Sequence, residues 1–188
     1  GWVAQHDAGR RALESAINTP QAARRVVTRY VENVAEGADA ERVIRDMARD
    51  GVDLIITPSF GYMEPTLKVA AEFPNVRFES ITGYKRLPNV ATANARYYEG
   101  RYLAGVAAAR VSKTNIAGYV AGFPIPEVLQ GINAFTLGAR SVNPDITCSV
   151  VFTGDWSMPV KEAEATNSLA DQGVDVFTMH VDSPKVIV

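Results

Sequence analysis

Two stretches, ARDGVDLIIT at residues 48–57 and ADQGVDVFTM at residues 170–179, follow the same pattern. In each, residues with helical spacing lead to a glycine, Gly51 or Gly173, of the kind that closes helices. A Val-Asp pair and a continuous apolar run follow, which predicts a buried strand of a parallel sheet. The copies lie 122 residues apart (173 minus 51), about one domain. The repeat therefore predicts two α/β lobes, with a cleft beyond the carboxyl ends of their strands.

The composition is that of an ordinary globular chain. It has 188 residues, of which 47% are hydrophobic and 21% charged, and its net charge is −2. A charge near zero without a long basic run argues against nucleic acid as a partner, because phosphate-backbone binding needs clustered Lys and Arg. The single cysteine, Cys148, lies in a strand-like run and is interpreted as a buried thiol. No apolar run approaches the roughly 18 residues of a membrane helix.

Strand-like and helix-like segments alternate along the chain, which predicts parallel sheets with right-handed crossovers. Strands are expected at residues 25–32, 52–58, 76–82, 115–122, 147–154 and 174–181. Helices are expected at residues 4–18, 38–50, 63–73, 97–111, 125–144 and 158–173. We assign residues 1–112 to a first lobe that lacks its first strand, and residues 113–188 to the start of a truncated second lobe. The chain is thus expected to be part of a longer protein.

Aromatic and polar residues gather where the predicted strands end. Aligning the two copies of the repeat pairs the loop at residues 58–62 with the loop at residues 181–184. Flat aromatic side chains offer large apolar contact to flat ligands, so a planar heterocycle is the expected guest. The candidate ligand-binding residues are Trp2, Ser59, Phe60, Gly61, Tyr62, Tyr84, Trp156 and Asp182. Two alternatives stay open: the tryptophans can be packing residues, and Asp182 can cap a helix that begins at Pro184.

Catalytic motifs are missing from the sequence. It contains no GxSxG, CxxC, HExxH, Walker or GxGxxG pattern in the required context, so no enzymatic activity, cofactor or metal is predicted. His6 and His180 lack metal-ligand spacing and are interpreted as structural or surface residues. Glu127 begins a helix, where a carboxylate suits the helix dipole.

Four stretches carry a resemblance to a known family. They are FGYMEPTLKVAAEFPNVRFESITGYK at 60–85, NARYYEGRYLAG at 94–105, YVAGFPIPEVLQGINAFTLGARSVNP at 119–144 and HVDSP at 180–184. Together they resemble the basic membrane protein family, the substrate-binding proteins of ABC importers that are similar to purine nucleoside receptor lipoproteins. The resemblance implies a type I periplasmic binding protein fold, with two doubly wound parallel-sheet lobes that close over a ligand by hinge motion. It also implies binding without catalysis.

The resemblance also implies a purine site. In relatives two aromatic residues sandwich the purine, and the matching positions here are Trp2 and Trp156. Polar groups that read the ring edge or ribose match Asp182, Tyr84 and the Ser59–Tyr62 loop. Tryptophan replaces the usual Phe at both stacking positions, and Asp182 replaces part of a Gly-rich turn. Both departures favour a bare base such as adenine, whose exocyclic amine could donate to Asp182.

The expected partners are a purine ligand and an ABC permease in the membrane, with no nucleic acid and with the protein itself monomeric. The expected location is the periplasm or the outside face of the cytoplasmic membrane, where a lipid anchor could hold it. Two other classes remain alternatives. One is a ligand-sensing domain of a receptor or regulator with the same fold, and the other is a purine-handling hydrolase.

Overall fold

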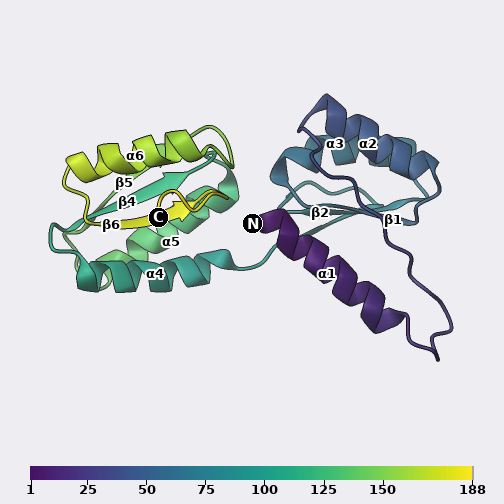
Figure 1. Ribbon diagram of the computed structural model, residues 1–188, viewed down its shortest axis with the longest axis horizontal. Helices are drawn as coiled ribbons and strands as arrows, with labels where there is room; N and C mark the ends of the chain where they lie inside the picture. The colour runs from purple at the N-terminus through teal and green to yellow at the C-terminus, as the bar shows by residue number, and fades with distance from the viewer. Residues whose placement is uncertain (188) are drawn as a thin grey trace. The chain divides into compact units, whose positions relative to one another are not determined.

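The computed structural model describes residues 1–187, which divide into two compact units (Figure 1). The first unit spans Trp2–Ala95, and the second begins at Arg96. Each unit contains one three-stranded sheet whose strands are all parallel. Within the described residues, no helix has the length and apolar character needed to span a bilayer. The expected α/β class with parallel sheets is confirmed.

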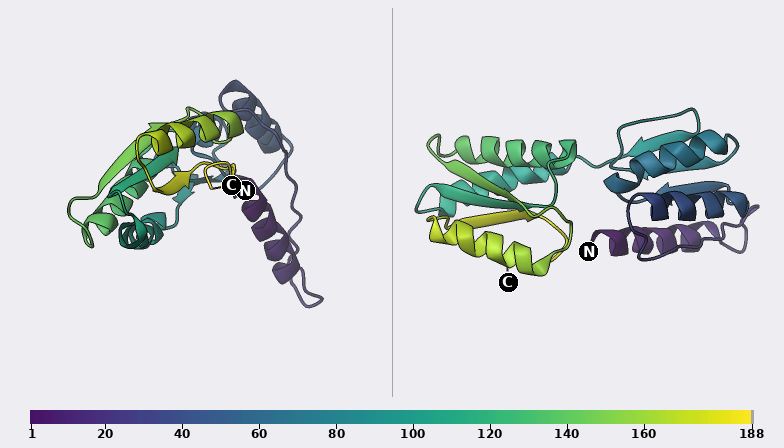
Figure 2. Two further views of the ribbon diagram at one scale, coloured as in Figure 1. Left: turned by 60° about the vertical axis from the view of Figure 1, so that its left-hand side comes forward. Right: turned by 90° about the horizontal axis from the view of Figure 1, so that it is seen from above.

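The sheet of the first unit has the order β1-β2-β3. Its strands are β1 (Leu54–Thr57), β2 (Arg77–Ile81) and β3 (Val90–Ala93). Its helices are α1 (Trp2–Ile17), α2 (Ala38–Arg49), the short 3-10 helix η1 (Phe60–Tyr62) and α3 (Met63–Glu72). Helices α2 and α3 lie side by side on one face of the sheet (Figure 2).

The core of the first unit explains why α2 forms where the spacing predicts it. Ala40, Ile44 and Ala48 recur every four residues, so one helix face is apolar, and all three are buried. They pack with Ile55 of β1 and Phe78 of β2. The opposite face of β1 differs from the prediction of a fully buried strand, because Leu54 and Ile56 are 50% and 51% exposed. Strand β1 lies at the edge of its sheet, and its burial alternates as in a strand covered on one face.

The predicted strand at residues 25–32 is wrong. This segment contains no strand in the structure, and Val27 is 90% exposed. A β-branched run becomes a strand only when a neighbouring strand satisfies its backbone groups, and no strand of the described residues pairs with it. The segment is held instead by Asn18, whose side-chain amide donates to the Val26 carbonyl at 2.7 Å and accepts from the Val26 N–H at 2.8 Å.

The structure also contains a strand that the sequence did not predict. Residues 89–95 were expected as a short connecting segment, whereas Val90–Ala93 form β3. The Asn89 side chain anchors the start of this strand by donating to the carbonyls of Ala70, Phe73 and Val76, each at 3.0 Å. These long-range bonds carry no local sequence signal, which explains the omission.

The sheet of the second unit has the order β5-β4-β6. Its strands are β4 (Ile116–Ala121), β5 (Thr147–Phe152) and β6 (Val176–His180). Helix α6 (Pro159–Asp171) lies on one face of this sheet, and α4 (Tyr97–Val111) and α5 (Pro126–Arg140) lie on the other (Figure 1). The strand order reverses at β4, as in doubly wound folds.

Helix α4 packs tightly against α5, which groups it with the second unit. A Cβ atom on Gly105 of α4 would lie 2.0 Å from the Phe135 carbonyl oxygen, and one on Gly138 of α5 would lie 2.0 Å from the Tyr102 carbonyl oxygen. The two backbones can therefore meet only because both positions are glycine. The contacts place the division before α4, at Ala95, whereas the sequence reading placed a domain boundary after residue 112. The boundary after residue 112 concerns domains that fold independently, and it stays a prediction.

Candidate ligand-binding site

The carboxyl ends of the three strands of the second unit meet at one edge of its sheet. Phe123 follows β4, Trp156 follows β5 and Asp182 follows β6. Because the strand order reverses at β4, the loops after β4 and β6 diverge at this edge. In open α/β sheets such a reversal is the place where ligands bind. The structure thus brings Trp156 and Asp182, two predicted site residues, together at one edge of the sheet.

Trp156 is the best-supported aromatic residue of this edge. Its ring centroid lies 5.1 Å from that of Phe123, with the planes at 68°, and 6.2 Å from that of His180. Its carbonyl oxygen accepts a hydrogen bond from the Asp182 N–H at 2.7 Å. Rings in such edge-to-face contacts add to stability beyond the area they bury. The indole is therefore held in place by its neighbours and by the loop that carries Asp182.

The Asp182 loop is itself anchored from α6. Glu162 is fully buried, and its carboxylate accepts from the Ser183 hydroxyl and from the Met158 N–H at 2.9 Å. The sequence left open whether Asp182 caps a helix that begins at Pro184; in the structure, residues 184–187 form a turn closed by a hydrogen bond from the Ile187 N–H to the Pro184 carbonyl at 3.0 Å. A buried carboxylate with these partners fixes the loop that follows β6. Glu162 therefore positions Asp182 without reaching the edge itself.

The sequence reading did not place His180 and Glu127 together. His180 is the last residue of β6, and its Nε2 lies 3.7 Å from Oε1 of Glu127, the second residue of α5. Burial, followed by the nearby positive charge of Arg101, lowers the pKa of His180 to about 4, so the ring is neutral at pH 7. Among the described residues, no group bonds to its buried Nδ1. His180 thus lies close to both the Trp156 ring and the Glu127 carboxylate.

The first unit gathers a second set of predicted residues at the end of β1. The Trp2 indole N–H donates to the Pro58 carbonyl at 2.6 Å, which ties the start of α1 to the loop after β1. Phe60 of the same loop lies 6.1 Å from the ring of Tyr84, which follows β2. Tyr84 is 60% exposed. The expectation that these aromatic residues share the end of one sheet agrees with this geometry, and their contact with a ligand stays a prediction.

The loop at residues 59–62 has a neighbour that the sequence reading missed. The Ser59 hydroxyl donates to Oε1 of Glu36 at 3.0 Å, and the Glu36 carboxylate occupies the space where a Cβ atom of Gly61 would lie. The Tyr62 hydroxyl donates to the Val34 carbonyl at 2.7 Å, and burial raises its pKa. Glu36 lies 23 residues before Ser59, so only the fold reveals this contact.

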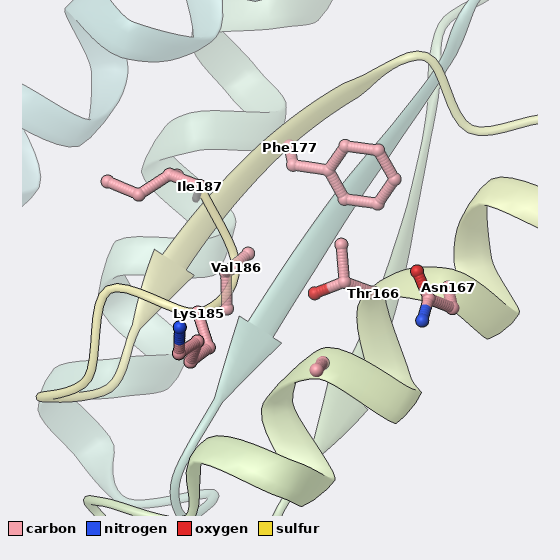
Figure 3. A pocket seen from close by; sticks show the side chains of 7 residues that line it. Thr166, Asn167, Phe177, Lys185, Val186 and Ile187 are labelled. Carbon is pink, nitrogen blue, oxygen red and sulfur yellow. The ribbon is translucent and has the colours of Figure 1, made fainter.

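Other hollows and clusters lie away from these strand ends. A cavity of about 580 Å³ in the second unit lies between α6, β6 and the residues that follow β6 (Figure 3). None of the predicted site residues lines it. Within residues 1–187, no group of three or more His, Cys, Asp or Glu side chains could hold a metal ion. The strand ends therefore remain the candidate site, and their aromatic and carboxylate groups suit a planar ligand that donates hydrogen bonds.

Comparison with solved structures defines the class of fold. An ABC transporter solute-binding protein from Aeropyrum pernix superposes with a TM-score of 0.73 at 28% identity, covering 93% of this chain and 48% of that chain. The fold is thus that of the periplasmic binding proteins, and this chain represents part of it.

Sequence comparison identifies the family. Residues 1–187 match the family model described as PnrA-like ABC transporter substrate-binding protein, and the chain belongs to this family. A purine-binding protein of Brucella abortus is 54% identical over the whole chain, which covers 52% of that protein. A Haloferax volcanii protein named as an ABC transporter glucose-binding protein is 42% identical and is covered to 46%. The chain thus spans about half the length of the curated relatives it matches.

Proposed function

We propose that this protein captures a purine base, with adenine favoured, and delivers it to the membrane permease of an ABC importer. The observation that carries the proposal is the fixed Trp156 indole beside the Asp182 loop, where the strand order of the second sheet reverses. The similarity to a purine-binding protein at 54% identity supports the same ligand class. The protein acts by binding and handover, without catalysis.

Stacking supplies most of the affinity in this proposal. Every nucleobase has a flat π face, and stacking one base on an aromatic side chain contributes about 1–3 kcal/mol. Phe123 and His180 both contact the indole and restrict its motion, so little side-chain entropy is lost when a base stacks on it. Trp156 therefore provides a preorganised platform for a purine ring.

The Asp182 carboxylate determines which base is preferred. A carboxylate only accepts hydrogen bonds, and the exocyclic amine of adenine donates them. A base that presents a carbonyl oxygen at the same place would face that carboxylate with another acceptor. Adenine is therefore preferred over purines that carry an oxygen at that ring position.

Residues of the first unit are also proposed as ligand contacts. Trp2, whose indole is held by Pro58, is the second stacking residue. The loop of Ser59, Phe60, Gly61 and Tyr62, together with Tyr84, contacts the ring edge. A ligand that binds the closed protein more tightly than the open one shifts the protein toward closure, and we propose that this difference in affinity drives handover. The whole protein acts as a monomer outside the cytoplasmic membrane.

Calorimetric titration with adenine, adenosine and glucose tests the proposal on the full-length protein. Adenine should bind most tightly, and Trp156→Ala should weaken its binding by about 1–3 kcal/mol, the range for one stacked base. Tyr102→Ala is the matched control, because it removes a half-exposed aromatic ring of α4 in the same unit. Binding of glucose without any purine, or unchanged adenine affinity in Trp156→Ala, would contradict the proposal.

A further inference from the structure

Gly122 occupies a fixed point at the end of the central strand of the second sheet. It follows β4, its N–H donates to the His180 carbonyl at 3.1 Å, and its own carbonyl accepts from the Gly154 N–H at 2.9 Å. These bonds continue the ladder toward both neighbouring strands by one residue. The Gly122 backbone is therefore tied on both sides and cannot easily move.

The Trp156 indole lies directly against this backbone. A Cβ atom on Gly122 would lie 2.7 Å from Cε3 and 3.1 Å from Cζ3 of Trp156, and 2.8 Å from the Asp155 carbonyl oxygen. Carbon atoms at van der Waals contact are about 3.5–4.0 Å apart, so no side chain fits at this position. Because Gly122 is held by both strands, any added side chain must displace the turn that carries Trp156.

We propose that Gly122 is a positioning residue of the ligand site, and this inference rests on the proposed function. The missing side chain sets how closely the indole approaches the sheet, and so sets where a stacked base lies. The Trp156 carbonyl also accepts from the Asp182 N–H, so a displaced turn disturbs the Asp182 loop as well. One atom at Gly122 thereby changes both the stacking platform and the group that reads the base.

Fluorescence of the ligand-free protein tests the positioning directly. Residues 1–188 contain two tryptophans, so Trp2→Phe leaves Trp156 as the only one in this part of the protein. In this background, Gly122→Ala should shift the emission maximum of Trp156 and increase its quenching by acrylamide. Gly100→Ala is the matched control: Gly100 lies in α4 of the same unit, and an added Cβ meets nothing within 4 Å. Unchanged emission and quenching in Gly122→Ala would overturn the inference, whatever the ligand proves to be.

Adenine affinity, measured with Trp2 intact, tests the consequence for binding. Gly122→Ala should raise the Kd for adenine about ten-fold, because a loss of about 1.4 kcal/mol, which lies within the range for stacking one base, is a factor of ten. Gly100→Ala should leave the Kd unchanged. A shifted indole with an unchanged Kd would overturn the role of Gly122 in binding. A wild-type protein that binds no purine would overturn the proposed function, while the fluorescence result would still decide the positioning.

A smaller aromatic ring provides the rescue experiment. Phe lacks the fused ring that carries Cε3 and Cζ3, so Gly122→Ala should cost less affinity in a Trp156→Phe background than beside Trp156. A merely structural defect at Gly122 would cost the same in both backgrounds and would overturn the inference. If Gly122→Ala alone does not fold, folding of the Gly122→Ala/Trp156→Phe double variant supports the clash with the indole. Failure of both to fold would show that the Asp155 carbonyl or the sheet, and not the Trp156 indole, requires the glycine, and would overturn the inference.

Discussion

The two Gly-Val-Asp joints share their backbone but use their aspartates differently. Gly51 and Gly173 have φ angles of 79° and 90°, and each closes its helix by donating to a carbonyl three residues earlier. The following valine N–H, of Val52 or Val174, bonds in both copies to the carbonyl five residues earlier. The two copies of the repeat thus end their helices with the same backbone conformation and the same hydrogen bonds.

The aspartates diverge. The Asp175 carboxylate accepts from the Ser112 hydroxyl at 2.6 Å and from the N–H groups of Lys113 and Thr114 at 2.5 and 3.0 Å. These bonds, with that of Ser112 the strongest, lower the pKa of Asp175 to about 2. Within the described residues the Asp53 carboxylate has no such bonds, and only its backbone carbonyl is used, by the Arg77 N–H. The identical Gly-Val-Asp sequence therefore gives the same helix end in both copies but different long-range contacts.

The largest expected effect tests how differently the two strands are buried. Ile55 and Phe177 hold the same place in the two copies, but Ile55 is 3% exposed, whereas Phe177 is half-buried and lines the cavity of Figure 3. Ile55→Ala should lower the free energy of unfolding of the first unit by about 2–5 kcal/mol. Phe177→Ala should cost the second unit less, although it removes more atoms, because its surroundings are already open.

Denaturant unfolding followed by tryptophan fluorescence measures the two units separately. Trp2 reports on the first unit and Trp156 on the second, so Trp156→Phe and Trp2→Phe backgrounds isolate each transition. An equal cost for Ile55→Ala and Phe177→Ala would show that the two strands are buried alike, and the contrast between the copies would fail.

A smaller effect tests the shared helix stop. Gly51→Ala and Gly173→Ala should each cost about 1–2 kcal/mol, since an L-residue with a Cβ atom is disfavoured at positive φ by about that amount. The same unfolding experiment should give nearly equal values for the two variants. Gly9→Ala, at an open position inside α1, serves as a control and should not destabilise. Strongly unequal costs would break the equivalence of the two joints.

The smallest effect separates the two aspartates. Asp175→Asn should lower the free energy of unfolding of the second unit by about 1 kcal/mol, the usual net contribution of a hydrogen bond, whereas Asp53→Asn should have almost no effect on the first. The pKa of Asp175 is lowered from 3.8 to about 2 on folding, so between these values the unfolded chain binds more protons. The stabilisation by Asp175 is therefore complete above about pH 4 and is lost as the pH falls toward 2.

Unfolding curves collected between pH 2 and 6 test whether the stabilisation by Asp175 decreases as the pH falls. The stability difference between wild type and Asp175→Asn should shrink as the pH falls. A constant difference over this range would mean that the Asp175 charge plays no part in the turn at residues 112–114.

Local signals in the sequence predicted most of the elements. The bounds of helices α2 and α4 agree with the expected ranges to within one residue. The signals that define such a helix, a periodic apolar face and a residue that ends the helix, lie within one short segment of sequence. Strand formation at residues 25–32 depended on a neighbouring strand, and β3 depended on the distant carbonyls that hold Asn89. Where the partner lies far along the chain, local propensity could not decide the structure.

The candidate site was predictable to a similar extent. The alignment of the repeat pointed to the loops that hold Trp156 and Asp182, because parallel strands end at the same edge. It could not show that Gly122 touches the indole, that Glu36 reaches Ser59 or that His180 approaches Glu127. These contacts depend on side-chain packing between elements that are distant in sequence.

The exposed segment at residues 25–32 has a consequence for how the protein is cleaved. Proteases need a substrate chain that is extended and free of secondary structure, and this segment provides one that carries Arg25 and Arg29. Trypsin therefore reaches it without any prior unfolding. A cut there breaks the covalent link between α1 and the sheet of the first unit, and a single hydrogen bond such as that from Trp2 to Pro58 contributes only about 1 kcal/mol to holding the two pieces together. Nicked protein would then run as two fragments on a denaturing gel.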